Sequence, residues 1–441
     1  MIPEQLTMNI SITFEIPFGK IPLAAIEETV RHSLKATGRL MIKAILEALQ
    51  ERLGSVLQAS SPGRLVRNGR HGRGRVFNTA FGKIRVANRQ LRDKETGKTL
   101  RLLPLVVDFR PRKRFSLGAL RSAIRLSVLT SFRQAAKETR YEMGTEAPSH
   151  ATVHRNFRGV FEGNEVSLRS WEFRYLMADT MKVRLQGGRG REEGWADGRV
   201  VLGAERPEGP WILLGIFVNR SWREVRKELE GCIDYGRVEV LISDGEPGIE
   251  ALLREGMKHQ RCTWHGRRDL SFLLYQDGYK GLENRELVDL LREVPLFKIN
   301  IRNRPEVREE VEEILKESQE LWKELLEVFD PEVYPRAHSY LRRLGENLFV
   351  FLEYFLEKGA WIPNVSNMVE NVIGRVKLRV RGIGRRWSEG GLIALFRAMA
   401  RRIFGVESWE AFEERWLGAG TCPKFVALEA KYHWRWPITP L

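Results

Sequence analysis

The order of apolar segments between residues 171 and 275 restricts the fold more than any other feature of the sequence. Three segments that predict strands come first, and Gly-, Arg- and Pro-containing breaks separate them. The elements that follow are predicted as a helix, a buried strand, a second helix and a short fifth strand. In chain order the segments are FRYLMADTMKVRL (173–185), GRVVLGAE (198–205), WILLGIFVN (211–219), SWREVRKELEGCI (221–233), VEVLIS (238–243), GIEALLREGM (248–257) and HQRCTWH (259–265). A three-stranded meander followed by this alternation predicts a mixed α/β sheet with its first strand in the centre.

Two carboxylates follow apolar strand residues in this region. Asp179 comes after Tyr175–Ala178, and Asp244 follows VEVLIS and precedes a glycine. Open α/β sheets place ligand sites at the carboxyl ends of their strands, so both residues are candidates. Asp244 also suits an ordinary Asp-Gly turn or a helix cap. Asp197 in GWADGRVVLG competes with Asp179, but it precedes a glycine at a predicted strand-entry turn, so we favour Asp179.

The charge balance indicates a polyanionic partner. The chain has 73 Lys and Arg against 57 Asp and Glu, a net charge of +16. No apolar stretch approaches membrane-spanning length and the N-terminus lacks a signal-peptide pattern, which favours nucleic acid over lipid. Three cysteines are too few for a disulfide framework. We therefore expect a cytoplasmic protein, nucleoid-associated when bound to DNA.

Two short helices are predicted at 131–143 and 149–160, on either side of a glycine-containing connection. If they form a helix-turn-helix, the second helix presents His154 and Arg155 to DNA; plain helical packing is the alternative. The Gly- and Arg-rich segment 60–75 is either a solvated loop or a phosphate-contacting one.

A last helix is predicted within NVSNMVENVIGRVKLRVRGIGRRWS (364–388), and it carries Asn367 and Glu370. A dense basic run follows: Arg375, Lys377, Arg379, Arg381, Arg385 and Arg386, ahead of Trp387. Such a run is either a solvated helix face or a track for DNA phosphates, and we favour the second because a candidate carboxylate precedes it. Trp387 either stacks on an unpaired base or packs in the core.

The combination of Asp179, Asp244 with QRCTWH downstream, and Asn367-x-x-Glu370 on a helix resembles the Mutator-type DDE transposases of bacterial and archaeal insertion sequences, over roughly residues 75–400. The resemblance implies a ribonuclease H-like α/β catalytic domain, which the strand order also matches. It implies Asp179, Asp244 and Glu370 as catalytic, metal-binding residues. It further implies Cys262, His265 and Asn367 as an active-site motif.

The domain organisation that we predict is a ribonuclease H-like catalytic domain interrupted by an α-helical insertion and preceded by an α+β DNA-binding region. Its parts are an N-terminal strand and helix (1–58), a basic loop and β-hairpin (59–115), a helical helix-turn-helix-like region (116–165), the catalytic domain (166–275 and 361–405), the insertion (276–360) and a C-terminal tail (406–441).

The chemistry implied by the resemblance needs acids. Two Mg²⁺ (or Mn²⁺) ions about 3.5–4 Å apart activate the attacking oxygen and stabilise the leaving one, and hard cations prefer carboxylate oxygens. The implied activity is DNA cleavage at inverted-repeat ends and transfer of the 3′-hydroxyl to target DNA, by a homodimer that joins two ends. A ribonuclease H-like nuclease and an inactive DNA-binding derivative are the rivals. A zinc site at His259, Cys262 and His265 lacks a fourth ligand nearby.

Overall fold

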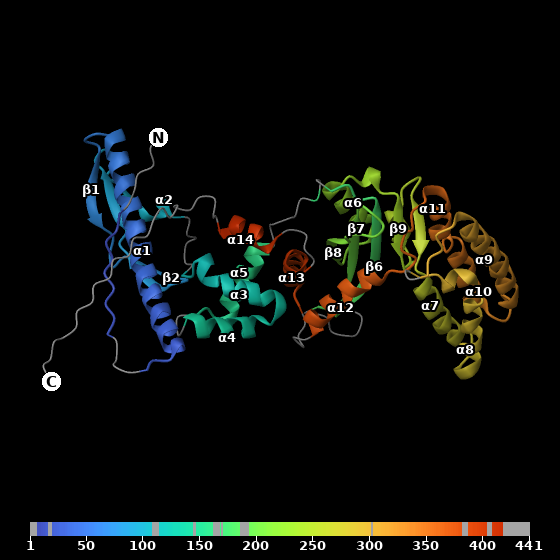
Figure 1. The fold of residues 1–441 in the computed structure, drawn as a ribbon. Helices are drawn as coiled ribbons and strands as arrows, with labels where there is room; N and C mark the ends of the chain where they lie inside the picture. Colours follow the sequence, from blue (N-terminus) through green and yellow to red (C-terminus); the bar gives the residue numbers. More distant parts are fainter. Residues whose placement is uncertain are drawn as a thin grey trace.

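The structure, a computed structural model, describes ten segments of the 441-residue chain: residues 7–15, 20–107, 114–143, 147–161, 168, 171–185, 194–300, 303–381, 387–403 and 408–417. Arg385 and Arg386, predicted to bind DNA, lie outside the described residues. The elements form an elongated arrangement with α1 at one end and α9 at the other (Figure 1). No helix in the described segments is both long and apolar enough to cross a membrane.

The N-terminal part consists of one long helix against short strands. Helix α1 contacts β1, β3, β4 and α2, and buried Gly38 faces Phe81 so closely that a Cβ there would collide with the phenylalanine ring. The strands form a three-stranded sheet ordered β1-β4-β5 and a separate β2–β3 hairpin. The bounds are α1 Leu23–Ser60, β1 Leu65–Arg70, β2 Arg75–Thr79, β3 Gly82–Val86, β4 Arg89–Asp93, β5 Thr99–Arg101 and α2 Leu103–Val106.

Two predictions for this part are corrected. The predicted strand MNISITFEI does not form over residues 8–15, where the alternating pattern finds no partner strand among the described residues. The segment 60–75 is not simply a loop, because Leu65 and Val66 begin β1 and pair with β4. The predicted hairpin around DKETG is confirmed as β4–β5.

The middle of the molecule is a helical layer drawn from both halves of the sequence. Helix α3 contacts α4 and α5, and α13 contacts α3, α5 and α14. The helices are α3 Leu117–Leu129, α4 Phe132–Met143, α5 His150–Phe161, α13 Glu389–Arg402 and α14 Trp409–Leu417. The two helices predicted at 131–143 and 149–160 are confirmed. The expected C-terminal tail begins instead with α14, whose Phe412 stacks on Phe161 at 5.3 Å and whose buried Glu413 pairs with Arg121 at 2.5 Å.

A five-stranded mixed sheet forms the next part, with β6 in the centre. Its order is β10-β9-β6-β7-β8; β6, β7 and β8 are antiparallel neighbours, whereas β9 and β10 run parallel to β6. The strands are β6 Tyr175–Arg184, β7 Trp195–Ala204, β8 Ile212–Val218, β9 Val240–Ser243 and β10 Lys258–Arg261. The predicted meander and central first strand are confirmed. All four residues of β9 are buried, as its unbroken apolar run predicts.

Helices from distant parts of the sequence cover this sheet. Helix α6 (Trp222–Cys232) connects β8 to β9 through the 3₁₀ turn η2 (Tyr235–Arg237), and α12 (Asn367–Arg381) lies across β6 and β7. The helix predicted at 248–257 is only a 3₁₀ turn, η3 (Ile249–Leu252), because the chain becomes extended at Leu253, with ψ 141°. Gly256, with φ +81°, then lies in the turn before β10. The predicted fifth strand ends at Arg261, and Cys262 begins the next helix.

The segment between β10 and α12 is helical throughout its regular elements, as predicted. Its helices pack against the β10 edge of the sheet and form the right-hand end of the molecule (Figure 1). They are α7 Thr263–Gln276, α8 Gly281–Asp289, η4 Leu290–Arg292, η5 Pro295–Lys298, α9 Arg308–Val328, α10 Pro335–Gly345 and α11 Val350–Lys358.

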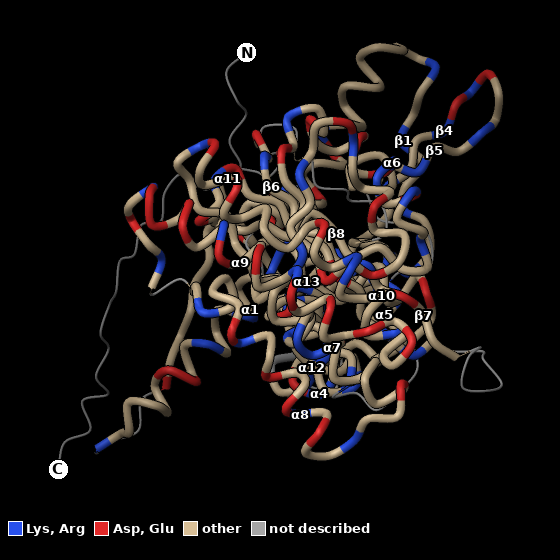
Figure 2. The backbone as a smooth tube through the Cα atoms, turned by 90° about the vertical axis from the view of Figure 1, so that its right-hand side faces the viewer, with Lys and Arg blue, Asp and Glu red and all other residues tan. Residues whose placement is uncertain are grey.

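Charged residues of both signs are interspersed along the backbone (Figure 2).

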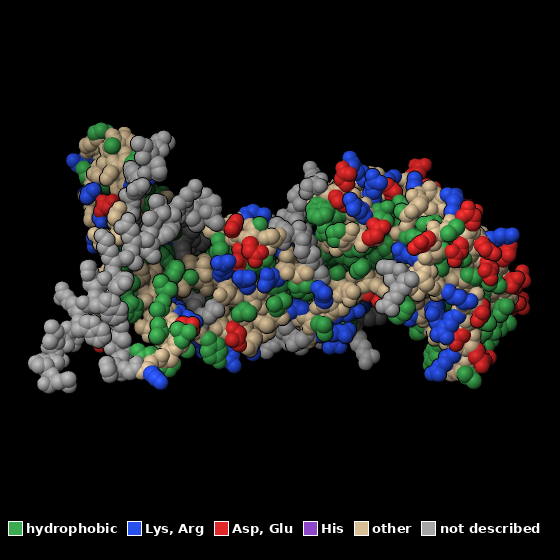
Figure 3. Space-filling model, in the orientation of Figure 1, with side chains coloured by type: hydrophobic (Ala, Val, Ile, Leu, Met, Phe, Trp, Pro, Cys, Tyr) green, Lys and Arg blue, Asp and Glu red, His purple; other side chains and the backbone are tan. Residues whose placement is uncertain are grey.

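A continuous apolar core joins the helical layer, the sheet and α7–α11, whereas Phe77, Ile84, Val86 and Leu103 form a separate core beneath α1. The N-terminal half of α1 leaves Leu23, Ile26, Val30 and Leu34 exposed, and apolar side chains are visible along this end of the molecule (Figure 3).

Candidate functional site

Asp179 and Asp244 lie side by side on neighbouring parallel strands. The last register pair of β6 and β9 is Ala178 with Ser243, and each aspartate is the next residue of its chain. Asp179 is not at the end of β6; it lies mid-strand, where the parallel partner ends and only β7 continues alongside. Its side chain is buried, with 8% exposure. The two predicted carboxylates therefore lie next to each other where the pairing of β6 with β9 ends, at the carboxyl end of β9.

Burial makes this pair of carboxyl groups hard to ionise. The pKa of Asp179 is raised from 3.8 to about 7; burial is the main cause, and the charges of Asp244 and Glu370 contribute to the same shift. Burial likewise raises the pKa of Asp244, against a hydrogen bond donated by the Glu246 amide to Asp244 Oδ1 at 3.0 Å. Two carboxyl groups this close titrate as a unit, so they favour a shared proton or a cation between them.

The turn after β9 is built around a glycine whose backbone conformation is strained for any other residue. Gly245 has φ +78°, and the guanidinium group of Arg261 occupies the space where a Cβ would be. Beyond it, Glu246 accepts hydrogen bonds from Thr180 Oγ1 and from Trp222 Nε1, the latter at 3.1 Å. These contacts fix the Asp244 turn to both β6 and α6.

Glu370 is brought near Asp179 by helix α12. One face of this helix is buried, which holds it across β6 and β7, and Glu370 lies in its first turn. The buried apolar residues are Val369, Val372, Ile373, Val376 and Val380. Glu370 is partly exposed and acts electrostatically on Asp179. The third predicted carboxylate, 126 residues after Asp244 in the sequence, thus lies near enough to Asp179 to raise its pKa.

Cys262 and His265 hold the start of α12 and orient Glu370. The Ser366 amide donates to Cys262 Sγ at 3.3 Å, and Ser366 Oγ is 3.2 Å from His265 Nδ1. His265 Nε2 is 3.4 Å from Glu370 Oε1. Burial lowers the pKa of His265 to about 4, so the ring is neutral at pH 7. Ser366 Oγ donates to Glu370 Oε1 at 3.4 Å and thereby links His265 to Glu370. The motif is therefore a positioning device beside the carboxylates.

His259 serves a different strand contact, so the three zinc candidates do not converge. Its Nε2 is 2.8 Å from Ser243 Oγ, and burial lowers its pKa to about 4. Burial also raises the pKa of the Cys262 thiol, which keeps it protonated at neutral pH.

A metal ion at the carboxylates is compatible with their chemistry but needs further ligands. Among the described residues, no three His, Cys, Asp or Glu side chains are grouped closely enough to hold an ion by themselves. The Asp179–Asp244 pair nevertheless offers buried carboxylate oxygens with raised pKa values, which suits a hard cation. Mg²⁺ retains water and takes substrate phosphate oxygens, so two carboxylates can hold one ion when substrate supplies the rest.

Asp197, the alternative to Asp179, is engaged elsewhere. It lies on β7 opposite Lys182 in the register and forms an ion pair with that residue, and Arg199 is 3.9 Å away.

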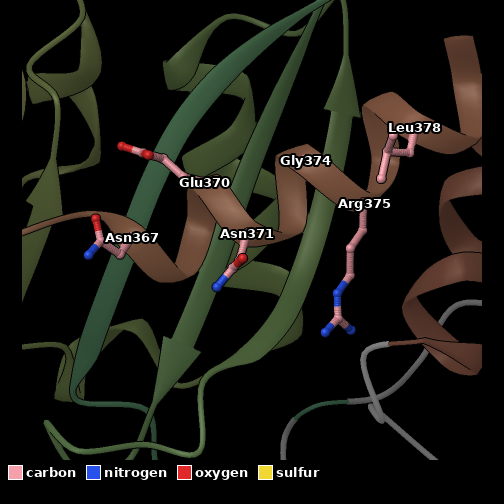
Figure 4. A pocket seen from close by; sticks show the side chains of 6 residues that line it. All are labelled: Asn367, Glu370, Asn371, Gly374, Arg375 and Leu378. Atoms are coloured by element: carbon pink, nitrogen blue, oxygen red, sulfur yellow. The ribbon is translucent and has the colours of Figure 1, made fainter.

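The outward face of α12 forms a groove of about 500 Å³ that begins at Glu370. Its lining residues come from successive turns of this one helix, as Figure 4 shows: Asn367, Glu370, Asn371, Gly374, Arg375 and Leu378. Asn367, which the sequence motif singled out, is exposed at the start of this face.

The predicted basic track is only partly available to a ligand. Arg375 and Arg381 are exposed and Lys377 is half-buried. Arg379 is buried instead: it donates to the carbonyl oxygens of Ser127, Val128 and Thr130, at 2.6–2.8 Å, and so caps the end of α3. The structure therefore gives Arg379 a stabilising role between α12 and α3, in contrast to the predicted DNA contact. Trp387 is also buried, 6.2 Å from the Phe132 ring, so it packs in the core and does not offer a free stacking face.

Helix α5 presents one of its two candidate DNA contacts. Arg155 is exposed, whereas His154 is half-buried with its ring centroid 4.9 Å from that of Phe132. The structure thus leaves Arg155 available to a partner and gives His154 a packing role.

Three residues of the site were missed by sequence reasoning: Ser366, Glu246 and Arg261. Ser366 directly precedes the apolar periodicity of α12, which is an N-cap signal that would have singled it out. Glu246 and Arg261 lie next to predicted motifs, but the sequence has no signal for their partners, which come from other strands.

Comparisons with known proteins cover the chain unevenly. A comparison with curated proteins found no match. Among solved structures, the Drosophila P element transposase strand transfer complex is similar with 13% identity and a TM-score of 0.35, over 67% of this chain and 94% of that one. Residues 20–196 match the model of an uncharacterised protein family, UPF0236, a match that includes Asp179 and ends within β7, before Asp244 and Glu370.

Proposed function

We propose that this protein is a DDE transposase of the Mutator type, with a ribonuclease H-like catalytic domain, that cleaves DNA at the inverted-repeat ends of its element and joins the 3′-hydroxyl ends to target DNA. The observation that carries the proposal is the buried Asp179–Asp244 pair on neighbouring parallel strands, with Glu370 of α12 near enough to raise the pKa of Asp179. The order β10-β9-β6-β7-β8 supports the fold assignment.

The residues divide the work as follows. Asp179 and Asp244, with Glu370, would hold Mg²⁺ or Mn²⁺, which supplies charge stabilisation for in-line phosphoryl displacement. His265 and Ser366 orient Glu370, and Cys262 fixes Ser366. Exposed Arg375 and Arg381, with half-buried Lys377, attract the phosphate backbone. Because two element ends must be joined, we expect a homodimer on double-stranded DNA.

The test uses labelled DNA from both flanks of the gene. Asp179→Asn, Asp244→Asn and Glu370→Gln remove charge with little change of shape, so each should keep DNA binding while cleavage and strand transfer are lost together. Asp197→Asn is the matched control and should cleave normally, since Asp197 is paired with Lys182.

The same assay separates the rivals. Cleavage without joined products would indicate a hydrolytic nuclease, and binding without cleavage would indicate an inactive derivative. Normal cleavage by all three carboxylate variants would contradict the proposed mechanism.

A further inference from the structure

Gly374 occupies a position in α12 where packing does not require glycine. It lies in the middle of this 15-residue helix, and a Cβ built on it would meet nothing within 4 Å. Glycine inside a helix is unfavourable relative to alanine because its backbone loses more conformational freedom. The residue therefore lowers helix stability without a compensating contact among the described residues.

The open space above Gly374 belongs to the groove that starts at Glu370. Asn371 and Arg375 project to the same side of the helix, on either side of Gly374 in sequence (Figure 4). Leu378, one turn further along, is 77% exposed and closes the lining. The face thus has an amide, a bare stretch of helix backbone, a guanidinium group and an apolar edge, in a line that leads to the carboxylates.

We propose that one strand of the DNA substrate passes along this face of α12 and makes its closest approach to the protein at Gly374. The inference rests on the proposed function and deepens it, because it assigns the path of the substrate strand. A guanidinium group pairs strongly with phosphate oxygens, and an Asn amide adds a donor of fixed direction. A side chain at position 374 would fill the space between these two groups and hold the strand away from Glu370.

The experiment compares Gly374→Ala and Gly374→Leu with Gly231→Leu. Gly231 is a suitable control because it is an exposed helical glycine of α6 whose Cβ would also meet nothing within 4 Å. Affinity is measured by fluorescence anisotropy with a labelled duplex that has a single-stranded 3′ extension, in Ca²⁺. Thermal midpoints and flank cleavage in Mg²⁺ are measured on the same preparations.

We expect Gly374→Ala and Gly374→Leu to keep or raise the thermal midpoint, by up to about 4 °C. Affinity and cleavage should fall in the order Gly, Ala, Leu, with a loss of about tenfold or more for leucine, as expected when a charge-assisted phosphate contact is lost. Gly231→Leu should retain both.

The possible failures are distinguishable. If wild-type protein neither binds nor cleaves the DNA, the proposed function fails. If wild-type protein is active and Gly374→Leu binds and cleaves equally well, the strand path is wrong and the function stands. If Gly374→Leu lowers the thermal midpoint, Gly374→Ala decides, since unchanged affinity in that variant overturns the inference.

Discussion

At the scale of single residues, the site places charge where the fold least tolerates it. Asp179 is buried in the central strand, directly after the buried apolar run Tyr175–Ala178. Ionising it requires removing a carboxylate from water beside Asp244, and this is why its pKa rises to about 7. Such a residue weakens the free protein, and the weakness is relieved only by a proton or a cation.

This reasoning predicts that Asp179→Asn stabilises the metal-free protein. The folded-state pKa of about 7 lies above the ordinary value of 3.8, so the wild type loses stability as pH rises through this window. Above pH 7 the substitution should raise the free energy of unfolding by about 2–4 kcal/mol. The gain should shrink as pH falls from 7 and vanish below the ordinary pKa of 3.8, where the wild-type carboxyl is protonated in both states. Urea unfolding in EDTA at several pH values measures it, and an equal gain at all pH values would contradict the proposed origin.

The positions of Asp179 and Asp244 could be predicted from the sequence, whereas the contacts that orient Glu370 could not. Asp179 and Asp244 could be predicted because each follows a local apolar run that marks a strand. The link from Ser366 to Cys262 joins residues 104 positions apart, and no periodicity encodes such a contact.

At the scale of elements, α12 has two faces with different duties. Its buried face packs on the sheet and ends with Arg379, which bonds to three carbonyl groups at the end of α3. Its outward face carries Glu370, Gly374 and Arg375. Arg375 and Arg379 lie four residues apart, yet Arg379 stabilises the contact with α3 and Arg375 faces the groove.

We therefore predict opposite effects for the two arginines. Arg379→Ala leaves buried carbonyl oxygens without donors and should lower the free energy of unfolding by about 2–4 kcal/mol. Arg375→Ala should leave unfolding unchanged and weaken DNA binding. Chemical denaturation and anisotropy on both variants make the comparison; a stable Arg379→Ala with weakened binding would restore the original prediction for this residue.

Helical periodicity alone could have anticipated this division. Arg379 lies between Val376 and Val380 on the apolar side of α12, and its burial follows from that position. The partner could not be anticipated, because α3 is 250 residues earlier in the chain. By contrast, the short 3₁₀ turn η3 shows that an amphipathic pattern of ten residues does not suffice for a helix, since the chain becomes extended at Leu253.

At the scale of the whole molecule, the chain has a net charge of +16, but its basic and acidic residues are interspersed along the backbone (Figure 2). Local basic positions near the site should therefore matter more than the total charge. The exposed or half-exposed set on α12 is Arg375, Lys377 and Arg381.

Replacing these three residues together with alanine should flatten the dependence of DNA affinity on salt. Each lost phosphate contact lowers the slope of log K against log salt by about 0.9 on B-DNA. The control is the triple alanine variant of Arg292, Arg308 and Lys316 in η4 and α9, at the end of the molecule that α7–α11 form, and it should keep the wild-type slope. Equal slopes for all three proteins would show that α12 does not contact the backbone.

The helical segment between β10 and α12 also delays the synthesis of Glu370 relative to that of the two aspartates. Asp179 and Asp244 emerge from the ribosome early, whereas Ser366 and Glu370 follow more than 120 residues after Asp244. Until then the apolar face of α12 is missing and β6 and β7 lack their cover. A nascent or prematurely terminated chain thus has the acidic pair without the third carboxylate. Under the proposed function, such a fragment would be unable to cut the genome that encodes it.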